Sequence, residues 1–126
     1  MYNYALRNSD ITLSPRGTAP ECFRTFEALE LGSIPLVSNE VTSKCKVRVT
    51  AGKENMAPPY RILKMYKAPV IYVDNWEQDI DAIMHDFRRL TDKQVAAWRC
   101  KMFTWYTDFK LQLKQKFVDD IKRLFV

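Results

Sequence analysis

The sequence predicts an α/β fold in which an incomplete parallel sheet is followed by a long C-terminal helix. Strand candidates at 11–14, 33–37 and 68–73 alternate with helix candidates, which is typical of parallel β/α architecture. Residues 91–126 carry apolar side chains three or four positions apart, the period of a helix. Only 3 glycines occur in 126 residues, which argues against a turn-dense β-sandwich.

The first unit of this pattern is a strand, a turn, a helix and a second strand. Pro15 stops the strand at 11–14, and a Pro- and Gly-rich turn follows at 15–20, where Gly17 can take a positive φ. Residues 21–31 are rich in helix formers. Gly32 stands where a left-handed C-cap ends such a helix. The tight connections predict two neighbouring parallel strands.

The middle of the chain is less regular. Residues 38–59 are dominated by Ser, Thr, Lys, Asn and Glu, and predict a long loop that leaves room for a short strand at 47–49. About two helical turns are expected at 60–66. The apolar, β-branched run that follows predicts the third strand, and residues 76–90 predict an amphipathic helix.

The last 36 residues predict one long helix. Thr91 with Gln94 three positions later forms a capping box. An unbroken helix over 91–126 would be about 50 Å long, which exceeds a small domain, so we expect it either to kink or to lie across a second domain. Its apolar stripe predicts core or interface contacts and consists of Val95, Trp98, Met102, Trp105, Phe109, Leu113, Phe117, Ile121 and Leu124.

Length and charge set broad limits on organisation and partners. A chain of 126 residues is one domain's worth, and three strands are about half of a doubly wound sheet. We therefore expect residues 1–126 to be the C-terminal part of a larger protein. The net charge is +5, and residues 91–126 contribute eight basic against four acidic side chains. This excess fits an anionic ligand but selects none. The chain contains no apolar run long enough for a membrane span and no secretory leader.

Several common catalytic and metal patterns are excluded. The three cysteines, Cys22, Cys45 and Cys100, have no zinc-type spacing, and their disulfide state stays open. His85 is the only histidine, and no GxSxG element accompanies it, so we expect a structural or surface role. The Asp79-Ile80-Asp81 run resembles a metal-binding DxD motif. On a helix its two carboxylates point roughly 200° apart, however, and cannot chelate one ion.

Residues 15–30 are the segment best suited to bind a ligand. A strand followed by a turn and a helix directs free N–H groups and the positive helix end toward one place, where phosphates bind. Arg16 and Arg24 lie near that place, and Glu27 shares a helix face with Arg24. This arrangement predicts a diphosphate at the turn and a ribose at Glu27. The alternative is an ordinary surface pair between Arg24 and Glu27, which contributes little.

The same segment resembles a known family. Leu13-Ser14-Pro15-Arg16-Gly17, then Glu21 to Leu29, then Gly32-Ser33-Ile34-Pro35 resemble the donor-binding element of exostosin-type glycosyltransferases, roughly P-R-G, F-R-x-x-E-A-L and a small residue before I-P. Similarity to one branch, which transfers xylose to ribitol phosphate, extends over nearly the whole chain. Its downstream matches are Ala57-Pro58, 62–64, 68–73, Asn75-Trp76, Trp105-Tyr106, Phe109-Lys110, Leu113-Lys114 and Lys116-Phe117.

The resemblance implies a fold and a reaction. It implies the C-terminal, Rossmann-like half of a GT-B-type enzyme, with an N-terminal domain outside this chain holding the acceptor. The implied reaction transfers xylose from UDP-xylose, with inversion, to a ribitol-phosphate glycan of the α-dystroglycan O-mannosyl type. No metal or other cofactor is expected, because the helix dipole and basic side chains stabilise the leaving diphosphate. The implied location is the Golgi lumen, with a membrane anchor outside this chain.

The resemblance also assigns site residues. It places Glu27 on the uridine ribose, and it places Arg24 with the 17–21 backbone on the diphosphate, so that the donor-binding set is Arg16, Gly17, Glu21, Arg24 and Glu27. Inverting transfer needs a base that deprotonates the acceptor hydroxyl, and the sequence identifies none in this chain. We therefore expect the isolated 126 residues to be inactive even where they bind nucleotide.

Two alternatives of other classes remain open at this stage. One is a non-catalytic module that engages nucleic acid or an acidic partner through the basic residues of the 91–126 helix. The aromatic side chains of that helix lie in the apolar stripe rather than among the charges, so nucleic acid is not the expected partner. The other is a truncated relative that keeps the fold without activity.

Overall fold

The computed structural model of the chain contains one parallel sheet, a separate hairpin and several helices. It describes residues 1–17, 21–40, 46–50, 53–56 and 59–125.

Three parallel strands form the sheet. They are β1 (Ile11–Ser14), β2 (Ile34–Ser38) and β5 (Ile71–Val73), in the order β1-β2-β5. Pro35 falls in the central strand, but β2 pairs with β5 only from Leu36 onward, so the missing proline N–H interrupts no bond to β5. The predicted α/β class and the parallel sheet are confirmed.

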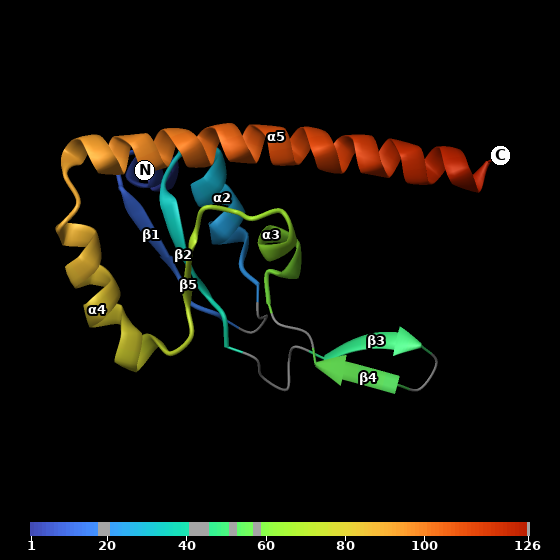
Figure 1. Cartoon of the computed structure of the whole chain (residues 1–126), viewed down its shortest axis with the longest axis horizontal. Helices are drawn as coiled ribbons and strands as arrows, with labels where there is room; N and C mark the ends of the chain where they lie inside the picture. Colours follow the sequence, from blue (N-terminus) through green and yellow to red (C-terminus); the bar gives the residue numbers. More distant parts are fainter. Residues whose placement is uncertain (18–20, 41–45, 51–52, 57–58, 126) are drawn as a thin grey trace.

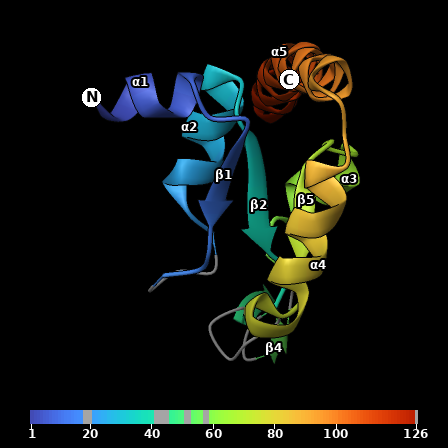
Figure 2. The ribbon, with the colours of Figure 1, turned by 90° about the vertical axis from the view of Figure 1, so that its left-hand side faces the viewer.

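Helices cover both faces of this sheet. Figures 1 and 2 show α2 (Phe23–Leu31) and α3 (Arg61–Met65) on one side of the strands, and α4 (Trp76–Arg88) on the other. The predicted left-handed C-cap of α2 is confirmed, because Gly32 has a φ of 80°. The Gly17 backbone, in contrast, does not adopt a positive φ.

Helix α5 (Asp92–Leu124) is continuous over 33 residues. The predicted capping box is present at Thr91 and Gln94. The helix crosses the edge of the sheet where β1 and β2 begin, and its last turns project beyond the sheet (Figure 1). Figure 1 shows that α5 is straight, so of the two expected outcomes the kink is wrong. The apolar stripe of the first half of the helix packs along this straight axis.

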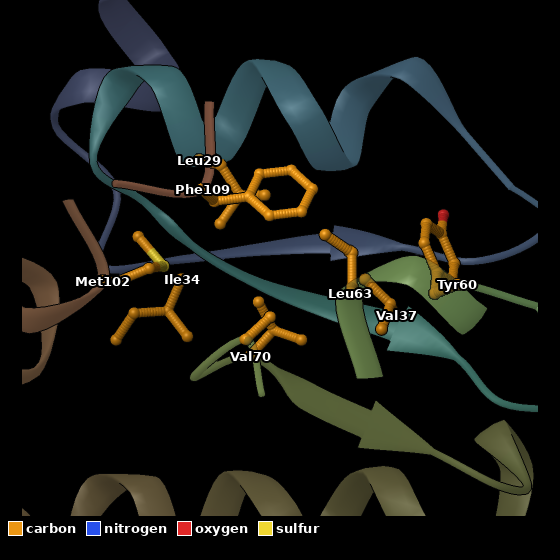
Figure 3. Close-up of a cluster of buried hydrophobic side chains, with 9 residues drawn as sticks. Leu29, Ile34, Val37, Tyr60, Leu63, Val70, Met102 and Phe109 are labelled. Atoms are coloured by element: carbon orange, nitrogen blue, oxygen red, sulfur yellow. The ribbon is translucent and has the colours of Figure 1, made fainter. Parts of the chain in front are cut away.

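The hydrophobic core lies between the sheet, α2, α3 and α5 (Figure 3). Leu29, Leu63 and Met102 are at most 1% exposed and represent the three helices. Ile34 and Val37 supply the sheet side, and both are fully buried. Burying such side chains contributes about 1.5–3 kcal/mol each, which fixes the position of α2 on the sheet.

Two elements differ from the predicted pattern. Helix α1 (Tyr2–Arg7) was not predicted, because it is short and only Leu6 of its residues is buried. Within the segment predicted as a loop, β3 (Lys46–Thr50) and β4 (Lys53–Met56) form an antiparallel hairpin. In β3, valines alternate with polar residues, which is typical of a strand, whereas the Lys-Glu-Asn-Met sequence of β4 has no strand pattern.

Candidate functional site

The carboxyl ends of β1, β2 and β5 lie on one edge of the sheet. These strands end at Ser14, Ser38 and Val73, and α2 begins at Phe23, shortly after β1. Open α/β sheets bind ligands outside this edge, and a helix N-terminus there attracts anions. The structure therefore places the start of α2 where the sequence predicts a ligand.

Arg24 and Glu27 both interact with the Tyr2 hydroxyl on the exposed side of α2. The Tyr2 hydroxyl of α1 donates a hydrogen bond to Glu27 Oε2 over 2.7 Å. This bond is the main cause of the raised pKa of Tyr2, and Arg24 acts on that pKa in the opposite direction. The structure thus brings the predicted ribose and diphosphate residues together, outside the hydrophobic core.

Glu21 has a different partner. Its Oε1 accepts a hydrogen bond from the Tyr60 backbone N–H over 2.7 Å. The Tyr60 hydroxyl in turn accepts from the Cys22 N–H over 2.9 Å. The Glu21 carboxylate therefore joins α2 to the start of α3, a contact that no local sequence pattern indicated.

Arg16 lies beside the end of β2. Its backbone N–H donates to Ser38 Oγ over 3.0 Å, and its Nε lies 3.5 Å from Glu40 Oε2. Around Gly17, a Cβ atom would have no neighbour within 4 Å among the residues that the structure describes. The turn after β1 is thus held by its backbone at Ser38 and is open at Gly17.

A polar cluster at the same edge was missed by the sequence analysis. Asn39 follows β2 and Asp74 follows β5, and the Asn39 amide donates to Asp74 Oδ1 over 2.6 Å. Lys64 of α3 donates to Asn39 Oδ1 and lies 5.3 Å from the centre of the Tyr72 ring. Polar residues directly after two adjacent parallel strands were the signal that could have revealed this cluster.

Burial shapes the electrostatics of this polar cluster. Burial lowers the pKa of Lys64, and the nearby Asp74 carboxylate opposes that effect. Burial also raises the pKa of Tyr72, whose hydroxyl is buried and has no hydrogen-bond partner among the described residues. The edge therefore places one ammonium and one carboxylate side by side.

A cavity of about 240 Å³ opens between α2, α3 and α5. Phe26, Tyr60, Tyr106 and Phe109 give it aromatic walls, and Glu21 is the one predicted site residue that lines it. Arg24 and Glu27 do not line it. The cavity and the Arg24–Glu27 pair are thus separate features of α2.

The excluded patterns can be compared with the structure. Asp79 and Asp81 lie on α4, as predicted, and Asp79 Oδ2 accepts from the Asn75 N–H over 2.8 Å. Within the described ranges, no three His, Cys, Asp or Glu side chains gather closely enough to hold a metal ion. His85 is a surface residue with 72% of its side chain exposed, as predicted. Cys22 and Cys100 are free thiols, and the side chain of Cys45 lies outside the described residues.

Comparison with known proteins places this architecture in a family. A family model described as the RXYLT1 C-terminal domain matches residues 1–126. The chain is 33% identical over 125 residues to ribitol-5-phosphate xylosyltransferase 1 of Danio rerio, covering 98% of this chain and 27% of the relative. The protein of that name from Mus musculus is 33% identical over 124 residues, again with 98% and 27% coverage.

The human protein agrees with these two. It is 32% identical over 127 residues, covering 99% of this chain and 27% of the relative. No solved structure matches the chain significantly. No helix in the described part of the chain combines the length and apolarity needed to cross a bilayer.

These matches place the chain among the C-terminal domains of proteins named as glycosyltransferases. More specifically, it belongs to the family of ribitol-5-phosphate xylosyltransferase C-terminal domains. The resemblance stated from the sequence is thereby confirmed. The chain spans about 27% of the length of the curated relatives that it matches.

Proposed function

We propose that this chain is the donor-binding part of an inverting, UDP-xylose-dependent xylosyltransferase with a GT-B-type, Rossmann-like architecture. The observation that carries the proposal is the position of α2. It begins at the carboxyl edge of a parallel sheet and carries Arg24 and Glu27 side by side. The family match over the whole chain supports the same reading.

In this proposal the diphosphate meets the start of α2. The helix dipole, the Arg24 guanidinium and the backbone of 17–21 would hold its charge, and Arg16 would add a second guanidinium from the turn. Because the Glu21 carboxylate is bonded to Tyr60, Glu21 would contribute its backbone rather than its side chain. No metal is needed to stabilise the leaving group in this scheme.

The ribose would bind to Glu27. A carboxylate accepts two hydrogen bonds from a ribose diol, as the acidic residue of Rossmann sites does. The Tyr2 hydroxyl now bonds to Glu27 Oε2, and Tyr2 is half-exposed, so a ribose hydroxyl can replace it at that oxygen. Donor binding would therefore exchange one hydroxyl partner of Glu27 for another.

The remaining parts of the reaction would come from elsewhere in a longer enzyme. An N-terminal domain would hold the ribitol-phosphate acceptor on an O-mannosyl glycan, of the kind carried by α-dystroglycan. That domain would also supply the base that deprotonates the acceptor hydroxyl. We place such an enzyme in the Golgi lumen, with its membrane anchor outside this chain. The chain alone would bind donor without turning it over.

Calorimetry tests the donor site. We expect the chain to bind UDP more tightly than UMP or uridine, with an affinity that EDTA does not change. Glu27→Ala and Arg24→Ala should each weaken UDP binding about tenfold or more, because each removes a charge-assisted hydrogen bond. Asp81→Ala, which removes an exposed carboxylate from α4, is the matched control. Unchanged UDP affinity in both site variants would overturn the assignment.

A further inference from the structure

Helix α2 lacks a side-chain cap of its own. Its N-cap residue is Cys22, and the Cys22 side chain accepts no hydrogen bond from the helix. The N–H groups of the N-cap and the first three helical residues have no partner within an α-helix. In α5 this need is met locally, because Gln94 Oε1 accepts from the Thr91 N–H and Thr91 Oγ1 accepts from the Gln94 N–H. In α2 the corresponding third helical residue is Thr25, a much shorter side chain.

The Tyr60 hydroxyl, from a distant part of the chain, provides the cap that α2 lacks. It accepts from the Cys22 N–H over 2.9 Å, and it shares a hydrogen bond with Thr25 Oγ1, also at 2.9 Å. In an ordinary capping box the third helical side chain reaches the N-cap N–H directly. Here Thr25 reaches it through the phenol, so Tyr60 supplies, from 35 residues away, the half of a capping box that serves the N-cap N–H.

Tyr60 is itself held firmly in place. It is 1% exposed and adopts a left-handed backbone with a φ of 55°, which is unusual for a residue with a side chain. Its backbone N–H donates to Glu21 Oε1 over 2.7 Å, so residues 21–25 and Tyr60 bond each other in both directions. Burial raises the pKa of Tyr60 further above its ordinary value near 10, so the hydroxyl is protonated at neutral pH.

We propose that Tyr60 is the positioning residue of the donor site. Through the clasp made by Glu21, Cys22, Thr25 and Tyr60, it fixes the start of α2 so that the remaining amides and Arg24 face the diphosphate. This inference rests on the proposed function and deepens it. It also assigns the Glu21 carboxylate to the clasp rather than to the ligand.

The chain offers a closely matched pair of variants. Tyr60→Phe removes the hydroxyl that bridges Cys22 and Thr25 and leaves the ring in the core. Tyr72→Phe removes a buried hydroxyl beside the core that has no hydrogen-bond partner in the described part of the chain. Thr25→Val removes the other half of the bridge at nearly constant volume. Each variant is compared with the wild-type chain for UDP affinity by calorimetry and for hydrogen exchange of the Cys22 amide by NMR.

We expect Tyr60→Phe to weaken UDP binding about tenfold and to accelerate Cys22 amide exchange about as much, because one capping hydrogen bond is lost. Thr25→Val should change both in the same direction by a smaller factor. Tyr72→Phe should change neither. Wild-type UDP affinity in Tyr60→Phe, whatever its melting temperature, would overturn the positioning role.

The two proposals can fail separately. A wild-type chain that binds no UDP contradicts the proposed function. An unchanged rate of Cys22 exchange in Tyr60→Phe contradicts the clasp, whether or not the chain binds UDP.

Discussion

Arg99 shows how much structure one side chain can hold. Its Nε donates to the Gly32 carbonyl over 2.6 Å, its Nη1 lies 3.1 Å from Asp10 Oδ1, and its Nη2 donates to the Arg7 carbonyl over 2.8 Å. Of these partners, Arg7 ends α1, Asp10 precedes β1 and Gly32 caps the end of α2. A single guanidinium of α5 thus binds the loops at the amino edge of the sheet.

Arg99→Lys should therefore lower the free energy of unfolding by about 2 kcal/mol, because an ammonium cannot reproduce a planar fork with separate donors. Urea denaturation measures this difference. Arg89→Lys, on the exposed end of α4, is the control and should stay within about 0.5 kcal/mol of wild type. Equal stability of the two variants would show that the Arg99 contacts add nothing.

The glycines provide a second prediction at the residue scale. Gly32→Ala should lower stability by about 1 kcal/mol because Gly32 has a left-handed backbone. The added Cβ itself causes no clash, since its nearest atom, Arg99 Nη2, lies at an ordinary 3.9 Å. Gly17→Ala should leave stability nearly unchanged, because the Gly17 backbone is not left-handed and a Cβ there meets no described atom within 4 Å. Thermal melts of the two variants compare these costs, and equal shifts would contradict the prediction.

Local residue patterns predicted caps but not distant partners. Gly32 and the Thr91–Gln94 box follow from short sequence signals, and both are confirmed. Glu21 was predicted to bind donor because the resemblance places the 17–21 backbone on the diphosphate. Its bond to Tyr60 spans 39 residues, and that separation leaves no periodic trace in the sequence.

At the element scale, α5 divides into two halves. Its first half buries Val95, Met102 and Phe109, whereas Phe117 is 66% exposed and Leu124 is 80% exposed. The spacing predicts one continuous apolar face. It does not predict where the underlying sheet ends, because periodicity identifies the face of a helix and not what covers it.

This division predicts opposite outcomes for two apolar truncations in one helix. Met102→Ala should lower stability by about 2–5 kcal/mol, because it opens a cavity beside Leu29 and Ile34. Phe117→Ala should change stability by less than about 0.5 kcal/mol. Guanidinium chloride denaturation followed by circular dichroism gives both values. A large loss in Phe117→Ala would show that the projecting turns pack against this same chain.

Sequence patterns did not predict helix α1 and predicted only one strand of the β3–β4 hairpin. The predicted strand at 47–49 falls within β3, but the polar second strand gave no signal. The strand predicted at 68–73 is shorter, because pairing with β2 begins only at Ile71. Element types were therefore predicted better than element boundaries, which depend on tertiary pairing.

At the scale of the whole molecule, buried phenols should make the fold sensitive to alkali. Burial raises the pKa values of Tyr60, Tyr72 and Tyr106 above the ordinary value near 10. A group whose folded pKa is raised contributes stability that is complete below the unfolded pKa and is lost as pH rises through the folded pKa.

The melting temperature should thus be lower at about pH 11 than at about pH 9, with the loss beginning near the unfolded pKa of about 10. Tyr60→Phe should show a smaller loss over that window, because one of the three buried phenols is gone. Calorimetric scans at several pH values test this expectation. A profile that is flat from about pH 9 to 11 would contradict it.

The α/β class, the parallel sheet and the family could be predicted from the sequence, because alternating strands and helices and the Arg24–Glu27 motif are both local features. The polar cluster was only partly within reach. Polar residues after two adjacent strands indicate Asn39 and Asp74, whereas Lys64 of α3 joins them only through the tertiary fold.

The projecting end of α5 has a consequence for a free copy of this chain. Its tip presents Phe117, Ile121, Leu124 and Phe125 to water among lysines, at exposures from 38% to 85%. An exposed apolar surface of this kind promotes association unless another surface covers it. Concentrated solutions of the isolated polypeptide should therefore associate through that tip.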